Sequence, residues 1–308
     1  MSRPKIVFMG TPEFSVPTLK ALYESFEIPA VVTVPDKPKG RGQKMMPSPV
    51  KAAAEELGLR VLQPVSLKDE DFINELKEID ADIFCIVAFR ILPTAVFTLP
   101  KIASFNVHTS LLPKFRGAAP INWAIIKGEK KSGVTSFILD ENIDTGNIVG
   151  TREVAIGESM TAGELHDELM PLAAELAVET CEQLLSGEYQ RLTQDDSLAS
   201  PAPKIFRDDC KIDFDMGAED LKNFINGMSP IPGAWTEFEG KKVKLLKSEI
   251  SSEIHTKPKN YLIKNDNFLL QTASGTVKVL VIQPEGKKVM QIRDFLAGYR
   301  GNKEGILE

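Results

Sequence analysis

An asparagine and a histidine stand two residues apart in the stretch FNVHTSLLPKFRGAAP of this 308-residue sequence. The apolar run before them predicts a strand over residues 103–108, and side chains two apart in a strand point to the same face. We therefore expect Asn106 and His108 to project together. Asp144 lies in the loop LDENIDTGN that follows the next predicted strand. An amide, an imidazole and a carboxylate thus form one candidate site.

These three groups suit the transfer of an acyl group to an amine. No GxSxG nucleophile elbow occurs, so the nucleophile is expected to come from the substrate. The neutral amide of Asn106 can donate a hydrogen bond to the oxyanion that forms at a formyl carbonyl. Imidazole titrates near neutral pH, so His108 can carry the proton of the amine. A neighbouring carboxylate, Asp144, would fix the ring tautomer and support the imidazolium.

Each of these residues also has a structural explanation. A single histidine at a strand end is most often a hydrogen-bonded structural residue, and asparagine and aspartate commonly close turns with their side chains. Residue spacing alone leaves both explanations open.

Apolar runs alternate with helical stretches up to about residue 190, which predicts an α/β fold with an open, largely parallel sheet. The expected strands are residues 5–10, 29–34, 82–89, 103–108 and 133–140, and the expected helices are 48–58, 66–80, 119–128 and 161–187. In such a sheet, ligands bind at the carboxyl ends of the strands, where Asn106, His108 and Asp144 would lie.

The C-terminal part follows a different pattern. Residues 191–210 gather Ser, Asp and Pro without periodicity and are predicted to form a linker. A helix over 218–228 is expected next, followed by short apolar segments with turns about every ten residues, typical of a small β-barrel. The predicted domains are therefore 1–190 and 211–308.

Charge is unevenly distributed in a chain whose net charge is −6. Residues 241–290 hold ten basic and four acidic side chains, which suggests a polyanionic partner, although a solvated lysine-rich surface is equally common. The insertion PDKPKGRGQKMMPSPVK is also basic and is expected to be extended and mobile. Its Lys37, Lys39, Arg41 and Lys44 are candidates for contact with a phosphate backbone, and a plain surface loop is the alternative.

Other patterns exclude several classes of protein. Neither GxGxxG nor GxxxxGK[ST] occurs, which argues against dinucleotide and P-loop chemistry. The three cysteines form no CxxC pair, so reduced thiols and no metal site are expected. The N-terminus does not resemble a signal peptide, and no segment approaches a membrane span, so we expect a cytoplasmic location.

Taken together, the motifs resemble those of the folate-dependent formyltransferases. The stretch NVHTSLLPKFRGAAP followed by DENIDTG is highly specific to that family, and VFMGTPEFSVPTL and INGMSPIPGAWT fall in the family's order. The basic insertion and the β-rich C-terminal part narrow the resemblance to the tRNA-modifying members. The resemblance implies a Rossmann-like formyltransferase domain and a smaller, OB-like C-terminal β-barrel domain that binds tRNA.

The resemblance also implies a reaction, namely formyl transfer from 10-formyltetrahydrofolate to the α-amino group of methionyl-initiator tRNA, for translation initiation and without a metal. Asn106, His108 and Asp144 would be the catalytic residues, and Arg41 would help to hold the tRNA acceptor end. Arg90 stands near the folate pocket where the family commonly has a small residue. Four consecutive residues would border the folate: Ser110, Leu111, Leu112 and Pro113. We expect no membrane partner, no obligate protein partner and a monomer.

Three other functions stay open at this point. A formyltransferase for a small amine, such as a nucleotide sugar or glycinamide ribotide, would share the three site residues without needing the basic insertion or the C-terminal barrel. A hydrolase of 10-formyltetrahydrofolate would release formate without an amine acceptor. A non-catalytic RNA-binding protein would bind tRNA and ignore folate.

Overall fold

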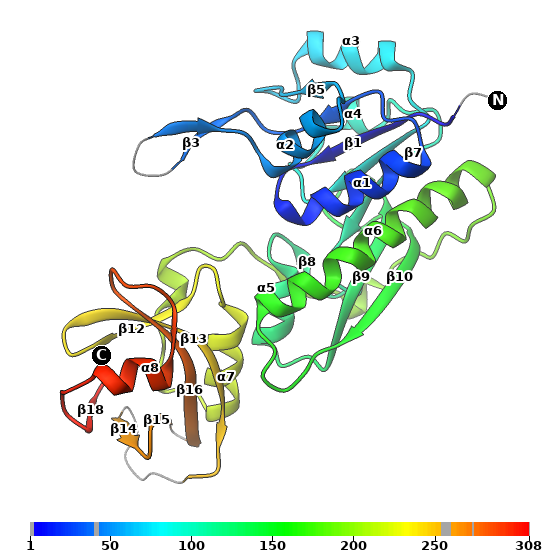
Figure 1. Ribbon diagram of the computed structural model, residues 1–308. Coiled ribbons are helices and arrows are strands. Elements are labelled where there is room, and N and C mark those ends of the chain that lie inside the picture. The colour runs from blue at the N-terminus through cyan, green and yellow to red at the C-terminus, as the bar shows by residue number, and fades with distance from the viewer. Residues whose placement is uncertain (1–2, 40–42, 254–259, 273, 308) are drawn as a thin grey trace. The chain divides into compact units, whose positions relative to one another are not determined.

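The computed structural model describes residues 3–39, 43–253, 260–272 and 274–307 of the chain. The chain divides into two compact units (Figure 1). The first comprises Met1–Gly117, Gly133–Val154 and Asp167–Pro201, and the second comprises Ala118–Ser132, Ala155–His166 and Ala202–Glu308. The domain boundaries near residues 190 and 210 stay a prediction.

A seven-stranded sheet forms the centre of the first unit, in the order β10-β9-β7-β6-β1-β2-β5. Its strands are β1 (Ile6–Gly10), β2 (Val31–Val32), β5 (Val61–Leu62), β6 (Ile83–Val87), β7 (Ala103–His108), β9 (Lys131–Ile138) and β10 (Ile148–Ala155). The pairs from β5 across to β7 are parallel, whereas β7 and β9 are antiparallel. The prediction of a mainly parallel α/β sheet is confirmed.

The central strands are buried because they consist of apolar residues that helices can cover from both faces. Every residue of β1 and of β6 is buried. The helices along this part of the chain are η1 (Glu13–Ser15), α1 (Val16–Ser25), α2 (Pro49–Glu56), α3 (Glu70–Ile79), α4 (Thr94–Phe97) and α6 (Ala162–Ser186). Ser48 caps α2 as predicted, since its Oγ accepts a hydrogen bond from the backbone N–H of Lys51 at 3.0 Å.

The structure differs from the sequence prediction at an edge strand and in the basic insertion. Strand β10 was not expected, because its sequence, IVGTREVA, includes Gly150 and polar residues and forms no continuous apolar run. The insertion, predicted as an extended loop, forms a hairpin of β3 (Lys37–Lys39) and β4 (Lys44–Met46). This antiparallel pairing satisfies backbone groups that an extended loop would leave to water.

The predicted linker also contains ordered segments. They are η2 (Asp196–Leu198), β11 (Pro201–Ala202) and η3 (Asp208–Cys210). The strand β8 (Arg116–Gly117) lies beside the middle of this segment, where the backbone N–H of Arg116 donates to the carbonyl of Ser200 at 2.9 Å. Part of the linker therefore belongs to the folded first unit.

The second unit is built on an antiparallel sheet in the order β12-β13-β16-β15-β14-β18, with β17 paired to β16. Its strands are β12 (Ala234–Phe238), β13 (Lys241–Ser251), β14 (Asn260–Lys264), β15 (Asn267–Thr272), β16 (Gly275–Pro284), β17 (Met290–Gln291) and β18 (Glu304–Ile306). Its helices are α5 (Pro120–Ile126), α7 (Ala218–Gly227) and α8 (Ile292–Gly298). The prediction of a smaller, OB-like β domain is confirmed.

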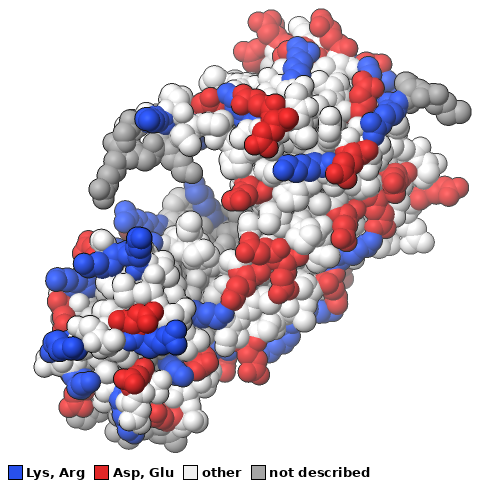
Figure 2. Space-filling model, viewed as in Figure 1, with Lys and Arg blue, Asp and Glu red and all other residues white. Residues whose placement is uncertain are grey.

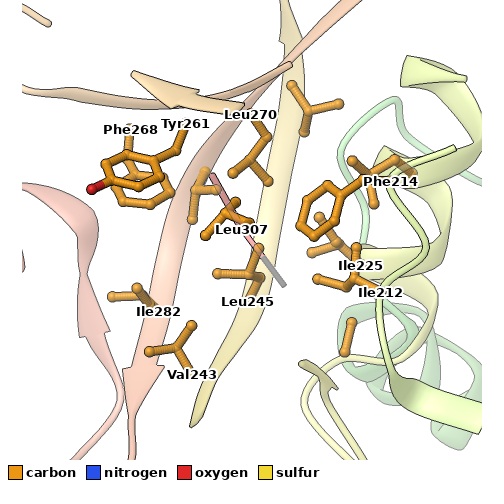
Figure 3. Packing of buried hydrophobic residues seen from close by; sticks show 14 of the residues in the cluster. Ile212, Phe214, Ile225, Val243, Leu245, Tyr261, Phe268, Leu270, Ile282 and Leu307 are labelled. Atoms are coloured by element: carbon orange, nitrogen blue, oxygen red, sulfur yellow. The ribbon is translucent and has the colours of Figure 1, made fainter. Parts of the chain in front are cut away.

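Aromatic rings fill much of the core of the second unit. Tyr261 and Phe268 stack with their ring centroids 5.5 Å apart, and Phe238 meets Tyr261 edge-on at 4.9 Å. Phe214 and Ile225 point toward the sheet from the side of α7 (Figure 3). Helix α8 adds Ile292, Phe295 and Leu296 to the same core.

Candidate active site

Strand β7 carries Asn106 and His108 at its carboxyl end. Asn106 pairs with Ile86 of β6 and Phe137 of β9, and His108 pairs with Thr135. The side chain of Asn106 is partly exposed, whereas His108 is only 6% exposed. No hydrogen-bond partner for the Asn106 amide occurs among the described residues, so its NH₂ group is free to meet a substrate.

Both nitrogens of the His108 ring face polar atoms. Nε2 lies 2.8 Å from the carbonyl oxygen of Phe115, and because a carbonyl only accepts, Nε2 carries the proton. Nδ1 faces Oδ2 of Asp144 at 3.7 Å, which is longer than a hydrogen bond. The tautomer is therefore set by the Phe115 carbonyl, and not by Asp144 as predicted. Asp144 remains well placed to support an imidazolium once Nδ1 takes up a proton.

The loop after β9 turns Asp144 toward the histidine. Asp144 has a φ of 57°, in the left-handed region that aspartate tolerates better than most residues. Its Oδ2 accepts a hydrogen bond from the backbone N–H of Gly117 at 2.8 Å. The same loop needs glycine at position 146, because a Cβ there would lie 1.7 Å from the carbonyl oxygen of Ile138. The structure thus brings all three predicted residues together.

Gln194 holds this loop from the other side, and no sequence signal pointed to it. Its side chain is buried, and its Nε2 donates to the carbonyl oxygens of Asp144 and Gly146 at 2.9 and 2.8 Å. Its Oε1 accepts from Nε and Nη2 of Arg116 at 3.1 and 2.7 Å. The residues on either side of Arg116 are Phe115, whose carbonyl contacts His108, and Gly117, whose N–H contacts Asp144. One buried amide therefore connects the two loops that hold the histidine and the aspartate.

A cavity of about 120 Å³ opens beside Asn106 and Asp144. Ile86, Phe89 and Leu92 contribute apolar walls, and polar side chains of the 140–144 loop complete the lining. A flat heteroaromatic ring needs this combination of apolar walls and a few polar groups at one end. The residues present therefore fit the pterin ring of a folate.

The four residues predicted to border the folate are not among the described residues that line this cavity. Ser110 and Leu112 are buried, the Ser110 hydroxyl donates to the carbonyl of Lys114 at 2.6 Å, and the Thr135 hydroxyl donates to the carbonyl of Ser110 at 2.7 Å. Both bonds shape the loop that ends at Phe115. Contact between folate and this segment stays a prediction for Ser110, Leu111, Leu112 and Pro113.

The basic hairpin is anchored at its base by an ion pair. Asp36 accepts hydrogen bonds from Nζ of Lys51 at 2.7 Å and Nε2 of Gln63 at 2.8 Å, and these bonds lower the pKa of the Asp36 carboxyl. Lys37 and Lys44 are exposed on the hairpin. Lys39 belongs to β3, and Arg41 lies outside the described residues.

The described part of the chain contains neither a cluster of metal ligands nor a membrane-spanning helix. There, no group of three or more His, Cys, Asp or Glu side chains is arranged to hold a metal ion. Within the same residues, no helix has both the length and the apolar character needed to cross a membrane.

Two family models match the chain: formyl transferase over residues 4–181, and the formyl transferase C-terminal domain over residues 204–300. The chain belongs to the formyl transferase family. Its relatives include the methionyl-tRNA formyltransferase of Clostridium novyi (strain NT), 45% identical over 308 residues, with 99% of this chain and all of the relative covered. That of Caldanaerobacter subterraneus is 43% identical, with the same coverage.

Solved structures share the fold at lower identity. The N-formyltransferase of Helicobacter canadensis, in complex with folinic acid and dTDP-3-aminofucose, has a TM-score of 0.69 at 21% identity, covering 91% of this chain and 99% of that one. HypX of Aquifex aeolicus, in complex with tetrahydrofolic acid, has a TM-score of 0.63 at 18% identity, covering 96% and 47%. At these identities the likeness shows the fold alone.

Proposed function

We propose that this protein transfers the formyl group of 10-formyltetrahydrofolate to the α-amino group of methionyl-initiator tRNA. The observation that carries the proposal is the meeting of Asn106, His108 and Asp144 beside a cavity with apolar walls. Full-length similarity to methionyl-tRNA formyltransferases supports the choice of acceptor. We further propose that the protein acts in the cytoplasm as a monomer, in translation initiation.

In this mechanism the folate supplies an activated formyl carbon. Side chains of the protein stabilise the charge that develops and transfer the proton. The free NH₂ of Asn106 donates to the formyl oxygen as attack by the amine makes it negative. Nδ1 of His108 takes the proton of the amine, because Nε2 is already engaged with the Phe115 carbonyl. The Asp144 carboxylate stabilises the resulting imidazolium. His108 then returns the proton to the leaving nitrogen.

Basic side chains in both units support the proposal that the formyl acceptor is a polyanion. Lys and Arg side chains are prominent, beside some Asp and Glu, on the visible face of the second unit (Figure 2). Strand β13 alone carries Lys241, Lys242, Lys244 and Lys247. Nζ of Lys242 lies 3.3 Å from the ring centroid of Trp235. Surfaces that combine cations with aromatic rings are used to bind single-stranded nucleic acids. A small-amine formyltransferase would need neither this surface nor the exposed Lys37 and Lys44.

A panel of acceptors tests the proposal. The protein is incubated with 10-formyltetrahydrofolate labelled in the formyl group and with methionyl-initiator tRNA, uncharged initiator tRNA, an amino sugar nucleotide or no acceptor. We expect label on the charged tRNA alone. Label on the amino sugar would favour the small-amine reaction, and formate released without an acceptor would identify a hydrolase. No turnover with bound tRNA would identify an RNA-binding protein.

We expect the double variant Lys37→Ala/Lys44→Ala to bind tRNA roughly tenfold more weakly near 0.1 M salt, because two phosphate contacts are lost. The slope of log Kd against log salt should become shallower by about 1 to 2. Filter binding over a salt series measures both. The control is Lys20→Ala/Lys68→Ala, which removes two exposed lysines outside the hairpin. Equal tRNA binding by the two double variants would exclude a role for the hairpin lysines.

We expect Gln194→Ala to lower kcat by about tenfold and the free energy of unfolding by about 1–3 kcal/mol, because the loop carbonyls and Arg116 lose a buried partner. Gln194→Glu keeps the acceptor for Arg116 but loses the donor to the loop, so its kcat should fall similarly. Formylation kinetics and thermal unfolding measure the two effects. Gln183→Ala on α6 is the matched control. Wild-type kcat in both Gln194 variants would show that the bridge is not needed.

A further inference from the structure

Arg90 joins two loops at the carboxyl edge of the first unit's sheet. It follows β6, and its guanidinium reaches the loop after β5, where Nη1 donates to the carbonyl of Val65 at 3.1 Å and Nη2 to that of Pro64 at 2.8 Å. In the sheet, β1 and β2 lie between β6 and β5. The side chain therefore spans the ends of two strands, beside the cavity that it lines together with Asn106.

The guanidinium is partly buried, and its Cζ lies over the Phe89 ring, 5.2 Å from the ring centroid. Among the described residues, its two acceptors are neutral carbonyls and no carboxylate pairs with it. Its Nε–H is buried without a partner, and burial lowers the pKa of the group. A buried donor without an acceptor destabilises the folded state. Arg90 therefore combines two hydrogen bonds and a ring contact with one unpaired donor, and its guanidinium joins two separate loops.

The segment that carries Arg90 has few other polar anchors. Within the described chain, no backbone hydrogen bond joins residues 88–92 to another segment. Ala88 adopts a left-handed φ of 48°, and Ile91 is 75% exposed. Yet Phe89 and Leu92 of this segment form apolar walls of the cavity. The two hydrogen bonds of Arg90 are therefore the described polar contacts that hold this wall in place.

We propose that Arg90 is a positioning residue for the formyl donor. Its planar guanidinium, with two hydrogen bonds, holds residues 88–92 against the loop after β5. The formyl donor then enters a preformed cavity, and residues 88–92 need not become ordered when it binds. This inference rests on the proposed function, because it takes the ligand of the cavity to be a folate. The role requires the planar shape of the guanidinium and not only its charge, because the ammonium group of a lysine cannot bind two carbonyls in the same planar geometry.

The test compares Arg90→Lys and Arg90→Gln with the wild-type protein. In both variants we expect faster hydrogen exchange of the 88–92 amides and about tenfold weaker equilibrium binding of 5-formyltetrahydrofolate. At saturating donor, kcat should stay within about twofold of wild type, and the KM for tRNA should not change, because the three reacting side chains are untouched. Arg60→Gln is the control, since Arg60 lies before β5 and pairs with Glu75 at the surface.

The other possible outcomes separate failure of the Arg90 inference from failure of the proposed function. Wild-type exchange and folate binding in Arg90→Lys would overturn the inference, because charge alone would then suffice. Normal folate binding in both variants, with tRNA formylation intact, would overturn it and leave the proposed function standing. A wild-type protein that binds 5-formyltetrahydrofolate but does not formylate tRNA would overturn the proposed function, and the exchange and binding results would still decide the role of Arg90. A wild-type protein that binds no folate would overturn both.

Discussion

Replacing His108 by alanine is expected to lower kcat for formylation of methionyl-tRNA by about 10² to 10⁴, the usual contribution of general acid–base catalysis. The expectation follows from the ring's geometry. Nε2 is committed to the Phe115 carbonyl at 2.8 Å, which leaves Nδ1, facing Asp144, as the atom that can take the proton of the amine. Without the ring, that proton must pass to water.

Single-turnover formylation at saturating donor and tRNA measures the effect. The Kd values for both substrates should change by less than about threefold, because the buried ring contributes little surface to either substrate. His166→Ala, which removes the histidine of α6, is the control and should keep the wild-type rate. Thermal unfolding shows that each variant is folded. A folded His108→Ala protein with wild-type kcat would contradict the role of proton carrier.

Asn106→Ala should lower kcat by about 10² to 10³, the range found when one donor to an oxyanion is removed. Asn106 is suited to this role because its amide is neutral, partly exposed beside the cavity, and has no partner among the described residues. The contribution appears only as charge develops on the formyl oxygen, so tRNA and folate binding should be retained. Rapid mixing with labelled donor measures the rate of the chemical step.

The variant Asn106→Asp separates the effect of hydrogen-bond donation from that of side-chain shape. The aspartate has almost the same shape but accepts hydrogen bonds when ionised, so it should be at least as slow as the alanine variant. Asn74→Ala on α3 is the control for loss of an exposed amide elsewhere. If Asn106→Asp kept most of the wild-type rate, shape rather than hydrogen-bond donation would explain the residue.

The parts of the fold that follow from local pattern could be predicted from the sequence. The continuous apolar runs of β1 and β6 indicate buried parallel strands, and the two-residue spacing of Asn106 and His108 places them on one strand end. These two inferences depend on residues close together in the sequence. The expectation that Asp144 follows a strand ending at the same edge was wrong in its reason, because β9 runs antiparallel to β7 and its last residue, Ile138, pairs with Phe105. Asp144 reaches His108 through the loop after β9 instead.

The remaining features depend on contacts between distant positions or on backbone atoms. Gln194 meets Arg116 and the Asp144 loop from a segment whose composition is typical of a linker. The Phe115 carbonyl fixes the histidine tautomer, and a carbonyl has no signature in a sequence because every residue has one. The same holds for the two carbonyls that accept from Arg90. Side-chain type pointed to the candidate residues, whereas the contacts that position them required the structure.

We expect the formyl group to pass directly from folate to the amine of the charged tRNA, with the protein contributing hydrogen bonds and proton transfer but no covalent bond. Rapid-quench analysis with 10-formyltetrahydrofolate labelled in the formyl group, enzyme in excess and methionyl-initiator tRNA distinguishes direct transfer from a covalent intermediate. We predict that label appears on methionyl-tRNA in a single phase and at no time on acid-precipitated, RNase-treated protein. Label on the protein that precedes label on the tRNA, or label released as formate, would contradict it.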